Sequence, residues 1–187
     1  MNLIAWRFEA SPTSNDDQVR PVVNDADFLR IVAGDSLGID PPEFFRQPAL
    51  GVGGKLLIGR CSCGVVGCRD VLVSVSVTGQ SITWQGPTSD AHHFDLGQYL
   101  ESFKSAATNT AWESVGRAAE RLVSSLDFAN LQGSGYWFEW ASTRVARGRV
   151  TLSFSNNGTQ RLFEIGWNEQ QAEDAEQQVR RWIAQYA

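Results

Sequence analysis

The sequence predicts an α+β fold in which antiparallel sheets of meander hairpins carry about four helices. The first observation is that strand-like segments occur in two groups, at residues 55–84 and 136–165. The second is that segments of helical periodicity follow each group, which is the order expected when helices cover a sheet. The third is the composition, since 42% hydrophobic and 20% charged residues in a chain of 187 suit a globular protein with a buried core.

The N-terminal segment is predicted to form two strands and a short helix. Residues 3–10 roughly alternate between apolar and polar side chains, and residues 19–23 form a second strand in which Pro21 suits an edge position. Asp25 then caps a helix that ends at Gly34, because Asp accepts hydrogen bonds from free amides and Gly suits a helix end. The buried face of this helix consists of Phe28, Leu29 and Val32.

Residues 35–54 are rich in proline and glycine and show no regular periodicity. We predict a long loop there, and two interpretations of it remain open. Long loops in compact domains are often functional or serve as arms that bind a partner. Alternatively, the loop is an ordered cover of the core, held in place by Phe44, Phe45 and Leu50.

The middle of the chain is predicted to form a three-stranded antiparallel meander. Its strands are residues 55–63, 68–77 and 81–84, and the chain reverses between the first two at residues 65–66. The odd-numbered valines of residues 71–77 share one face of the second strand, and the serines between them share the other.

Two helices are predicted to follow this meander. Asp95 is the expected N-cap of the first helix, with Gln98 three residues later. Thr110 and Glu113 fit a capping box at the start of the second helix. On that second helix, the side chains expected on the solvent side are Arg117, Glu120 and Arg121.

The C-terminal part is predicted to form a second meander and a final helix. Its strands are residues 136–145, 150–155 and 161–165, and Asn157 begins a hairpin turn between the last two. Asn168 is the expected cap of the last helix. We expect one domain over residues 1–187, with a weak subdivision near Gln132, where a short Gly/Ser stretch separates the two meanders.

Aromatic residues are unusually dense in residues 136–140. Because a strand exposes alternate side chains, one of two sets must face away from the core. The first set is Trp137 with Glu139, and the second is Tyr136, Phe138 and Trp140. An exposed aromatic set can anchor a partner, and the alternative is a second packed layer that buries both sets.

The three cysteines lie within eight residues, at Cys61, Cys63 and Cys68. If residues 55–63 and 68–77 are paired strands, Cys63 and Cys68 face each other at the base of the loop, with Cβ atoms about 4.5–5.5 Å apart. Cys61 lies two residues before Cys63 and therefore points to the same side. We predict that three sulfur atoms meet on one face of this hairpin.

Three interpretations of this cluster remain open. In the first, Cys61, Cys63 and Cys68 are three ligands of a zinc ion, and His92 or His93 completes the tetrahedron. The spacing of the cysteines differs from the usual Cys-x2-Cys pair of zinc sites. We therefore expect no cofactor unless these residues bind zinc.

The other two interpretations involve no metal. In one, Cys63 and one partner cysteine form a reversible disulfide or reactive thiol pair, next to the basic side chains of Arg60 and Arg69. In the other, the cysteines are small apolar residues buried in a tight hairpin, since free cysteine is among the most buried residue types.

The segment G-R-C-x-C-G-V-x-G-C, at residues 59–68, resembles a stretch of uncharacterised bacterial proteins of similar length. In these proteins, segments similar to residues 138–142 and 151–155 also occur, and the similarity extends from Pro41 to the last helix. The resemblance implies a bacterial cytosolic protein. It brings no known activity, ligand or catalytic residue with it.

The net charge and the lack of known motifs limit the classes of function that we expect. The net charge of −5 disfavours nucleic acid and anionic membrane surfaces as partners. No apolar run is long enough to span a membrane and no signal peptide is evident, so we expect a cytoplasmic protein. No catalytic motif is present, and we predict a non-catalytic domain that binds another protein. The alternatives are a zinc- or thiol-dependent protein centred on the cysteines, and an enzyme with His92 or His93 as base.

Overall fold

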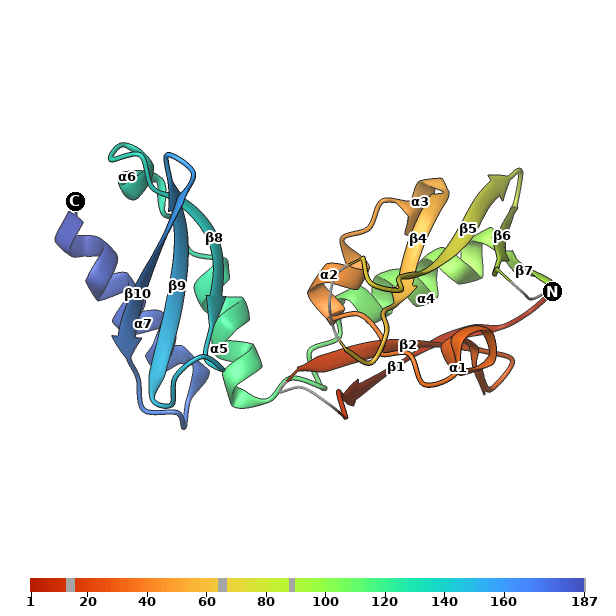
Figure 1. The fold of residues 1–187 in the computed structure, drawn as a ribbon, viewed down its shortest axis with the longest axis horizontal. Coiled ribbons are helices and arrows are strands. Elements are labelled where there is room, and N and C mark those ends of the chain that lie inside the picture. Colours follow the sequence, from red (N-terminus) through yellow and green to blue (C-terminus); the bar gives the residue numbers. More distant parts are fainter. Residues whose placement is uncertain (13–15, 64–66, 88–89, 187) are drawn as a thin grey trace. The chain divides into compact units, whose positions relative to one another are not determined.

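A computed structural model of the chain describes residues 1–12, 16–63, 67–87 and 90–186. These residues form two units, Met1–Asn109 and Thr110–Ala187, each with its own hydrophobic core (Figure 1). Both units combine antiparallel sheet with helices, which confirms the α+β class. Within the described residues seven α-helical segments occur rather than about four, partly because short helices form where a loop was expected.

The boundary between the units differs from the predicted organisation. One domain with a weak subdivision near Gln132 was expected, whereas the division falls between Asn109 and Thr110. The physical reason is that the helix at Val115–Ser124 packs on the sheet and the helix that follow it in the chain. A short Gly/Ser stretch marks a turn, and only the packing of the flanking elements decides whether a domain ends there.

The first sheet of the N-terminal unit has the order β1-β2-β3, formed by β1 (Ile4–Ala10), β2 (Asp17–Val23) and β3 (Ala26–Asp27). The two predicted strands are confirmed, but Pro21 lies in the middle strand, opposite Trp6. Because β3 pairs only with Val22 and Val23, Pro21 needs no amide hydrogen bond to β3.

Helix α1 (Phe28–Ala33) begins at Asp27 rather than at the predicted Asp25. Asp25 instead has a φ of 66° in the preceding turn, and the Asp27 carboxylate accepts a hydrogen bond from the amide of Arg30 at 3.0 Å. The same carboxylate accepts hydrogen bonds from Arg20 at 2.6 and 3.1 Å and from Arg7 at 2.6 Å. Asp27 therefore joins α1 to both long strands of the first sheet.

The Asp27 carboxylate gives the N-terminal unit a defined acid sensitivity. Burial alone would raise its pKa, but the hydrogen bonds from Arg20 and the Arg30 amide, with the positive charges of Arg20 and Arg7, hold the pKa below its usual value. The stabilisation is complete above the ordinary pKa of about 3.9 and is lost as the pH falls through the lowered pKa. Asp27→Asn is expected to weaken hydrogen-exchange protection of the β2 amides at pH 7. As the pH is lowered into the acid range, protection should then fall less in the variant than in the unchanged chain. An unchanged pH profile would contradict this.

The second sheet has the order β4-β5-β6-β7. Its strands are β4 (Gly54–Gly59), β5 (Val71–Thr78), β6 (Ser81–Gln85) and β7 (Ala91–Asp95). The predicted three-stranded meander is confirmed, and a fourth strand, β7, extends the sheet beyond it. Strands β4 and β5 are also shorter than predicted at their connected ends, so the cysteines lie between them rather than on them.

Three further helices pack on the strands of this unit. Helices α2 (Pro41–Phe45) and α3 (Ala49–Val52) form within residues 35–54, so this segment is an ordered cover rather than a long loop. Helix α4 (Leu96–Thr108) contacts β1, β6 and β7, and its predicted N-cap Asp95 accepts a hydrogen bond from the amide of Gln98 at 2.9 Å.

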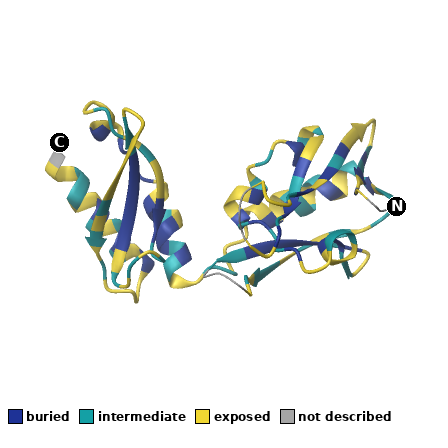
Figure 2. Cartoon of the chain, viewed as in Figure 1, coloured by how far each residue is buried: buried dark blue, intermediate teal, exposed yellow. Residues whose placement is uncertain are grey.

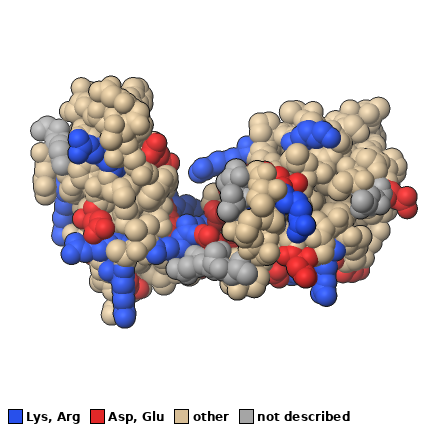
Figure 3. Space-filling view, viewed as in Figure 1, with Lys and Arg blue, Asp and Glu red and all other residues tan. Residues whose placement is uncertain are grey.

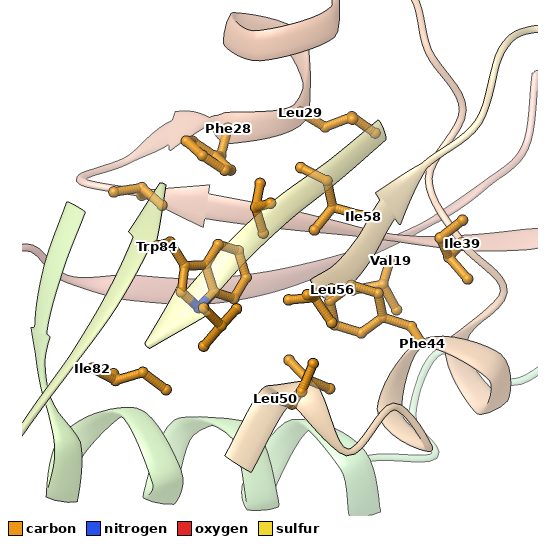
Figure 4. Close-up of a cluster of buried hydrophobic side chains, with 14 of the residues drawn as sticks. Val19, Phe28, Leu29, Ile39, Phe44, Leu50, Leu56, Ile58, Ile82 and Trp84 are labelled. Atoms are coloured by element: carbon orange, nitrogen blue, oxygen red, sulfur yellow. The ribbon is translucent and has the colours of Figure 1, made fainter. Parts of the chain in front are cut away.

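The core of the N-terminal unit is rich in aromatic rings. Trp84 is fully buried, and its ring centroid lies 5.9 Å from those of Trp6 and Phe28. Figure 4 shows Trp84 between side chains of the strands and helices of this unit. Phe44 of α2 and Leu50 of α3 are both fully buried, which explains why a segment without clear periodicity is still ordered.

The C-terminal unit is a three-stranded sheet of order β8-β9-β10, covered on one face by two helices. Its elements in chain order are α5 (Val115–Ser124), α6 (Ala129–Gln132), β8 (Trp137–Ser142), β9 (Arg149–Asn156), β10 (Thr159–Gly166), α7 (Ala172–Ile183) and a 3-10 turn (Ala184–Tyr186). The central strand β9 is the most buried, as its dark blue colour in Figure 2 shows. The turn at Asn157 and Gly158 is confirmed, with φ angles of 49° and 77°.

Two of the predicted helix caps in this unit are wrong. Helix α5 is capped by Ser114, whose hydroxyl accepts a hydrogen bond from the amide of Arg117 at 3.2 Å, whereas Thr110 lies in the turn before it. Helix α7 begins after Gln171, and the side chain of Asn168 instead accepts hydrogen bonds from the Gln170 and Gln171 amides. Both errors place the start of the helix a few residues too early, because several residues in these turns have capping chemistry.

Arg117 and Glu120 are buried, although both were predicted to face solvent. Their side chains form an ion pair at 2.8 Å. Glu120 also accepts hydrogen bonds from the amide of Thr143 at 2.8 Å and from the guanidinium of Arg144 at 3.1 Å. The Glu120 carboxylate therefore links α5 to the end of β8, and helical periodicity alone does not reveal such a contact.

Candidate metal centre

The three cysteines lie in the connection between β4 and β5, not on paired strands as predicted. Cys61 is buried, with 6% of its surface exposed, whereas Cys63 and Cys68 are exposed. The predicted reversal at residues 65–66 lies outside the described residues. The cysteines are therefore held by a loop whose two ends are fixed by the sheet.

The connection brings the three sulfur atoms together. The sulfur atoms of Cys61, Cys63 and Cys68 all lie within 4.8 Å of one another. Cys61 and Cys63 are joined by a disulfide, with a Cα–Cα distance of 5.4 Å, and Cys68 is a free thiol. The three cysteines are thus close enough to bind one metal ion when they are reduced.

The start of the cysteine loop is fixed through Arg60. The amide of Arg60 donates to the carbonyl of Leu37 at 2.8 Å, and the Leu37 amide donates back to the Arg60 carbonyl at 2.8 Å. The Arg60 guanidinium also forms an ion pair with Glu43 of α2. The residue immediately before Cys61 is therefore attached to two segments outside the β4–β5 hairpin.

The end of the cysteine loop is fixed through Asp70. Its carboxylate accepts a hydrogen bond from the amide of Gly67 at 3.3 Å and lies 3.8 Å from Nε of Arg60. Asp70 thus connects the residues on both sides of the cluster. Leu37 and Glu43, the residues that hold Arg60, are distant in sequence, so the spacing of the cysteines alone does not predict these contacts.

Gly59, the last residue of β4, lies where the chain passes close to Leu29 of α1 and to Leu37. A Cβ atom at this position would lie 2.6 Å from Cδ1 of Leu29 and 2.8 Å from the backbone oxygen of Leu37. Only glycine allows this approach, because the Leu37 oxygen belongs to the backbone and has little freedom to move. The close approach holds the entrance to the cysteine loop against α1 and residue 37.

Gly59→Ala is therefore expected to destabilise the N-terminal unit by about 1–3 kcal/mol. Loss of hydrogen-exchange protection in β4 and β5 would measure the effect. Gly51→Ala is the matched control, because a Cβ atom at Gly51 meets nothing within 4 Å and alanine favours helix α3. Equal protection in the two variants would show that the approach at Gly59 is not important.

The structure does not bring either histidine to the sulfur atoms. His92 and His93 lie on β7, at the opposite edge of the sheet from β4. The ring of His92 packs edge-to-face on Phe28 at 5.1 Å, and Nδ1 of His93 lies 3.0 Å from the hydroxyl of Thr83. The Cys3His arrangement predicted from the sequence is thus not formed, and an acid–base role for these histidines stays a prediction.

An open pocket of about 470 Å³ lies beside the end of the cysteine loop. Its lining contains apolar side chains together with Ser36, Arg69 and Asp70. Arg69 directly follows Cys68 in the chain, but Cys61, Cys63 and Cys68 are not among the lining residues. The full lining is Val32, Ala33, Ser36, Arg69, Asp70, Val71, Leu72 and Pro87.

A second surface feature lies on the C-terminal sheet. The pairing of β8 with β9 shifts between Phe138 and Trp140, so Trp140 lies on the same sheet face as Trp137. This is the face not covered by α5 and α7, and 57% of Trp137 and 37% of Trp140 are exposed. Simple alternation assigned these tryptophans to opposite faces, because a bulge cannot be recognised from alternation alone. Protein binding through this face stays a prediction.

Basic and acidic side chains are mixed on the side of the molecule shown in Figure 3, so the visible surface of each unit carries both signs of charge. In the described part of the chain, no helix is long and apolar enough to span a bilayer. The chain matches no protein-family model, no curated protein and no solved structure. The resemblance to bacterial proteins with the same cysteine segment therefore stays a prediction.

Proposed function

We propose that the N-terminal unit binds one zinc ion through the thiolates of Cys61, Cys63 and Cys68. The observation that carries this proposal is the mutual distance of the three sulfur atoms, all within 4.8 Å. With Zn–S bonds of about 2.3 Å, two sulfur ligands of a tetrahedral zinc ion lie about 3.8 Å apart. The limit of 4.8 Å is close to this separation, so one zinc ion is within reach of all three sulfur atoms.

The type of ligand favours zinc over magnesium or calcium. Three thiolates are soft ligands, which select zinc, copper(I) or iron–sulfur clusters, whereas magnesium and calcium need oxygen ligands. Zinc is the common choice for an isolated set of cysteines in a reducing environment. A disulfide offers no thiolate, so the form that binds metal is the one in which Cys61 and Cys63 are reduced.

Three protein ligands leave one position of the tetrahedron open. Zinc sites with a structural role have four protein ligands, and sites with three protein ligands hold water or a bound molecule in the fourth position. The two histidines, on the far edge of the sheet, do not fill this position. Cys63 and Cys68 are exposed, so a small donor molecule can reach the cluster from solvent. We therefore assign the site to the class with an exchangeable fourth ligand.

The supports of the loop also favour a metal site. Arg60 and Asp70 attach both ends of the connection to the body of the unit. Neighbouring residues that fix the orientation of the ligands are a regular part of metal sites. A cluster of merely buried cysteines, the third interpretation from the sequence, would not leave Cys63 and Cys68 exposed.

Metal analysis combined with thiol titration tests the proposal. Protein purified under reducing conditions is expected to contain about one zinc ion per chain. Its three thiols should react slowly with a disulfide reagent and rapidly after a strong chelator is added. Three thiols that react freely without the chelator, in protein that contains no zinc and takes none up, would overturn the proposal.

A further inference from the structure

The same three cysteines occur in an oxidised arrangement in the structure. Cys61 and Cys63 form a disulfide, and Cys68 stays free although its sulfur also lies within 4.8 Å of the other two. The disulfide contains two of the three sulfur atoms that the proposed metal site needs as ligands. The two states therefore exclude each other.

We propose that the site is a redox switch in which a hydroperoxide joins Cys61 to Cys63, releases the zinc ion and leaves Cys68 as a free thiol. This proposal rests on the proposed zinc site and adds its regulation. The proposal names Cys61 and Cys63 as the pair that forms, whereas three cysteines at these distances allow three different disulfides.

The distance between the Cα atoms permits this pairing. The Cα atoms of Cys61 and Cys63 are 5.4 Å apart, inside the range of about 4.4–6.8 Å that disulfides require. The disulfide closes a loop with a sequence separation of only two residues. Disulfides that close short loops stabilise a fold least, so this bond contributes chemistry rather than structural support.

Exposure assigns a different role to each cysteine of the pair. Cys63 is exposed and can meet a hydroperoxide, whereas Cys61 is only 6% exposed. Exposed thiolates are the ones oxidised to sulfenic acid, and a neighbouring thiol then converts the sulfenic acid to a disulfide. We therefore assign Cys63 as the attacking residue and Cys61 as the resolving residue.

The reaction balances in two steps. The Cys63 thiolate attacks one oxygen of hydrogen peroxide, the O–O bond breaks, and a sulfenic acid and a hydroxide ion form. The Cys61 thiolate then attacks the Cys63 sulfur, the S–O bond breaks, and a second hydroxide ion leaves. Two thiolates are oxidised by two electrons and the peroxide is reduced by two.

Oxidation removes two of the three charged ligands at once. A disulfide sulfur carries no negative charge, and zinc binding by cysteine depends on the thiolate form. Cys68 alone is then the single remaining thiolate, so the metal is released. Reduction of the disulfide restores all three ligands.

The test treats the zinc-loaded full-length chain with one equivalent of hydrogen peroxide and follows zinc with a chromogenic chelator. Free thiols are alkylated, and trypsin, which cuts after Arg60 and Arg69, releases residues 61–69 with all three cysteines in one peptide. The expected products are released zinc and a peptide with one disulfide and one alkyl group, placed on Cys68 by fragment ions. A dithiol reductant should restore zinc binding.

Two variants sharpen this test. Cys68→Ser is expected to form the same Cys61–Cys63 disulfide, and Cys61→Ser is expected to lose it. Retained zinc, a disulfide that includes Cys68, or direct oxidation of Cys63 to sulfinic acid would overturn the switch and leave zinc binding intact. A reduced chain that takes up no zinc would instead overturn the proposed function, so the two failures are distinguishable.

Discussion

Cys63→Ser is expected to lower the zinc affinity of the reduced chain by at least about 100-fold. Loss of a residue that only orients a metal ligand costs about 10–100-fold in affinity, so loss of the ligand itself should cost at least the upper value. Serine keeps the size of the exposed side chain at this position, which limits the change to the ligand atom. Competition against a chelator of known affinity measures the effect.

The matched control is Ser62→Ala. Ser62 lies between the two cysteines and is exposed, so the variant changes the same loop without changing a sulfur atom. Its zinc affinity is expected to equal that of the unchanged chain within about twofold. If Ser62→Ala and Cys63→Ser weaken zinc binding equally, the loop rather than the sulfur atom is responsible, and the assignment of Cys63 as a ligand fails.

Glu120→Gln is expected to destabilise the C-terminal unit by about 3–5 kcal/mol. The substitution keeps the shape of the side chain and removes its charge opposite the buried guanidinium of Arg117. It also weakens the acceptor for the Thr143 amide and for Arg144. Breaking a buried ion pair on one side is costly because the attraction within the pair is lost while the remaining charge stays buried. Hydrogen-exchange protection of the β9 amides reports this loss for the C-terminal unit alone.

Glu176→Gln provides the control for this prediction. Glu176 pairs with Arg180 one helical turn away on α7, and 61% of the Arg180 side chain is exposed. Exposed pairs of this type contribute only about 0.3–0.5 kcal/mol. If the two variants lower protection in β9 to the same degree, the burial of Glu120 does not explain its contribution to the stability of the C-terminal unit.

Features that depend on neighbours in the chain were predictable. The alternation in β1 and in the valines of β5, the cap at Asp95 and the turn at Asn157 are set by side chains within a few residues. Local chemistry decides each of these elements, and tertiary packing reinforces it.

Features that depend on distant neighbours were not predictable. Strand β7 is short and contains two histidines, and it becomes a strand because β6 offers it an unpaired edge. The ends of α2 and α3 are set by burial of Phe44 and Leu50 in a core made by other segments. The burial of Glu120 likewise depends on residues 142–144 more than 20 positions away.

The cysteine cluster was predictable from the sequence only in part. Its density in the sequence correctly indicated that three sulfur atoms meet. The predicted route, a hairpin with Cys63 opposite Cys68, was wrong because β4 ends at Gly59 and β5 begins at Val71. The loop is held instead by Leu37, Glu43 and Asp70, contacts that no local spacing indicates.

X-ray absorption at the zinc edge of the reduced, zinc-loaded chain tests the central claim most directly, because it counts sulfur ligands without any substitution. We expect three sulfur atoms at about 2.3 Å from the zinc ion and one oxygen or nitrogen atom at about 2.0–2.2 Å. A shell made only of oxygen and nitrogen, or one with fewer than three sulfur atoms, would contradict it.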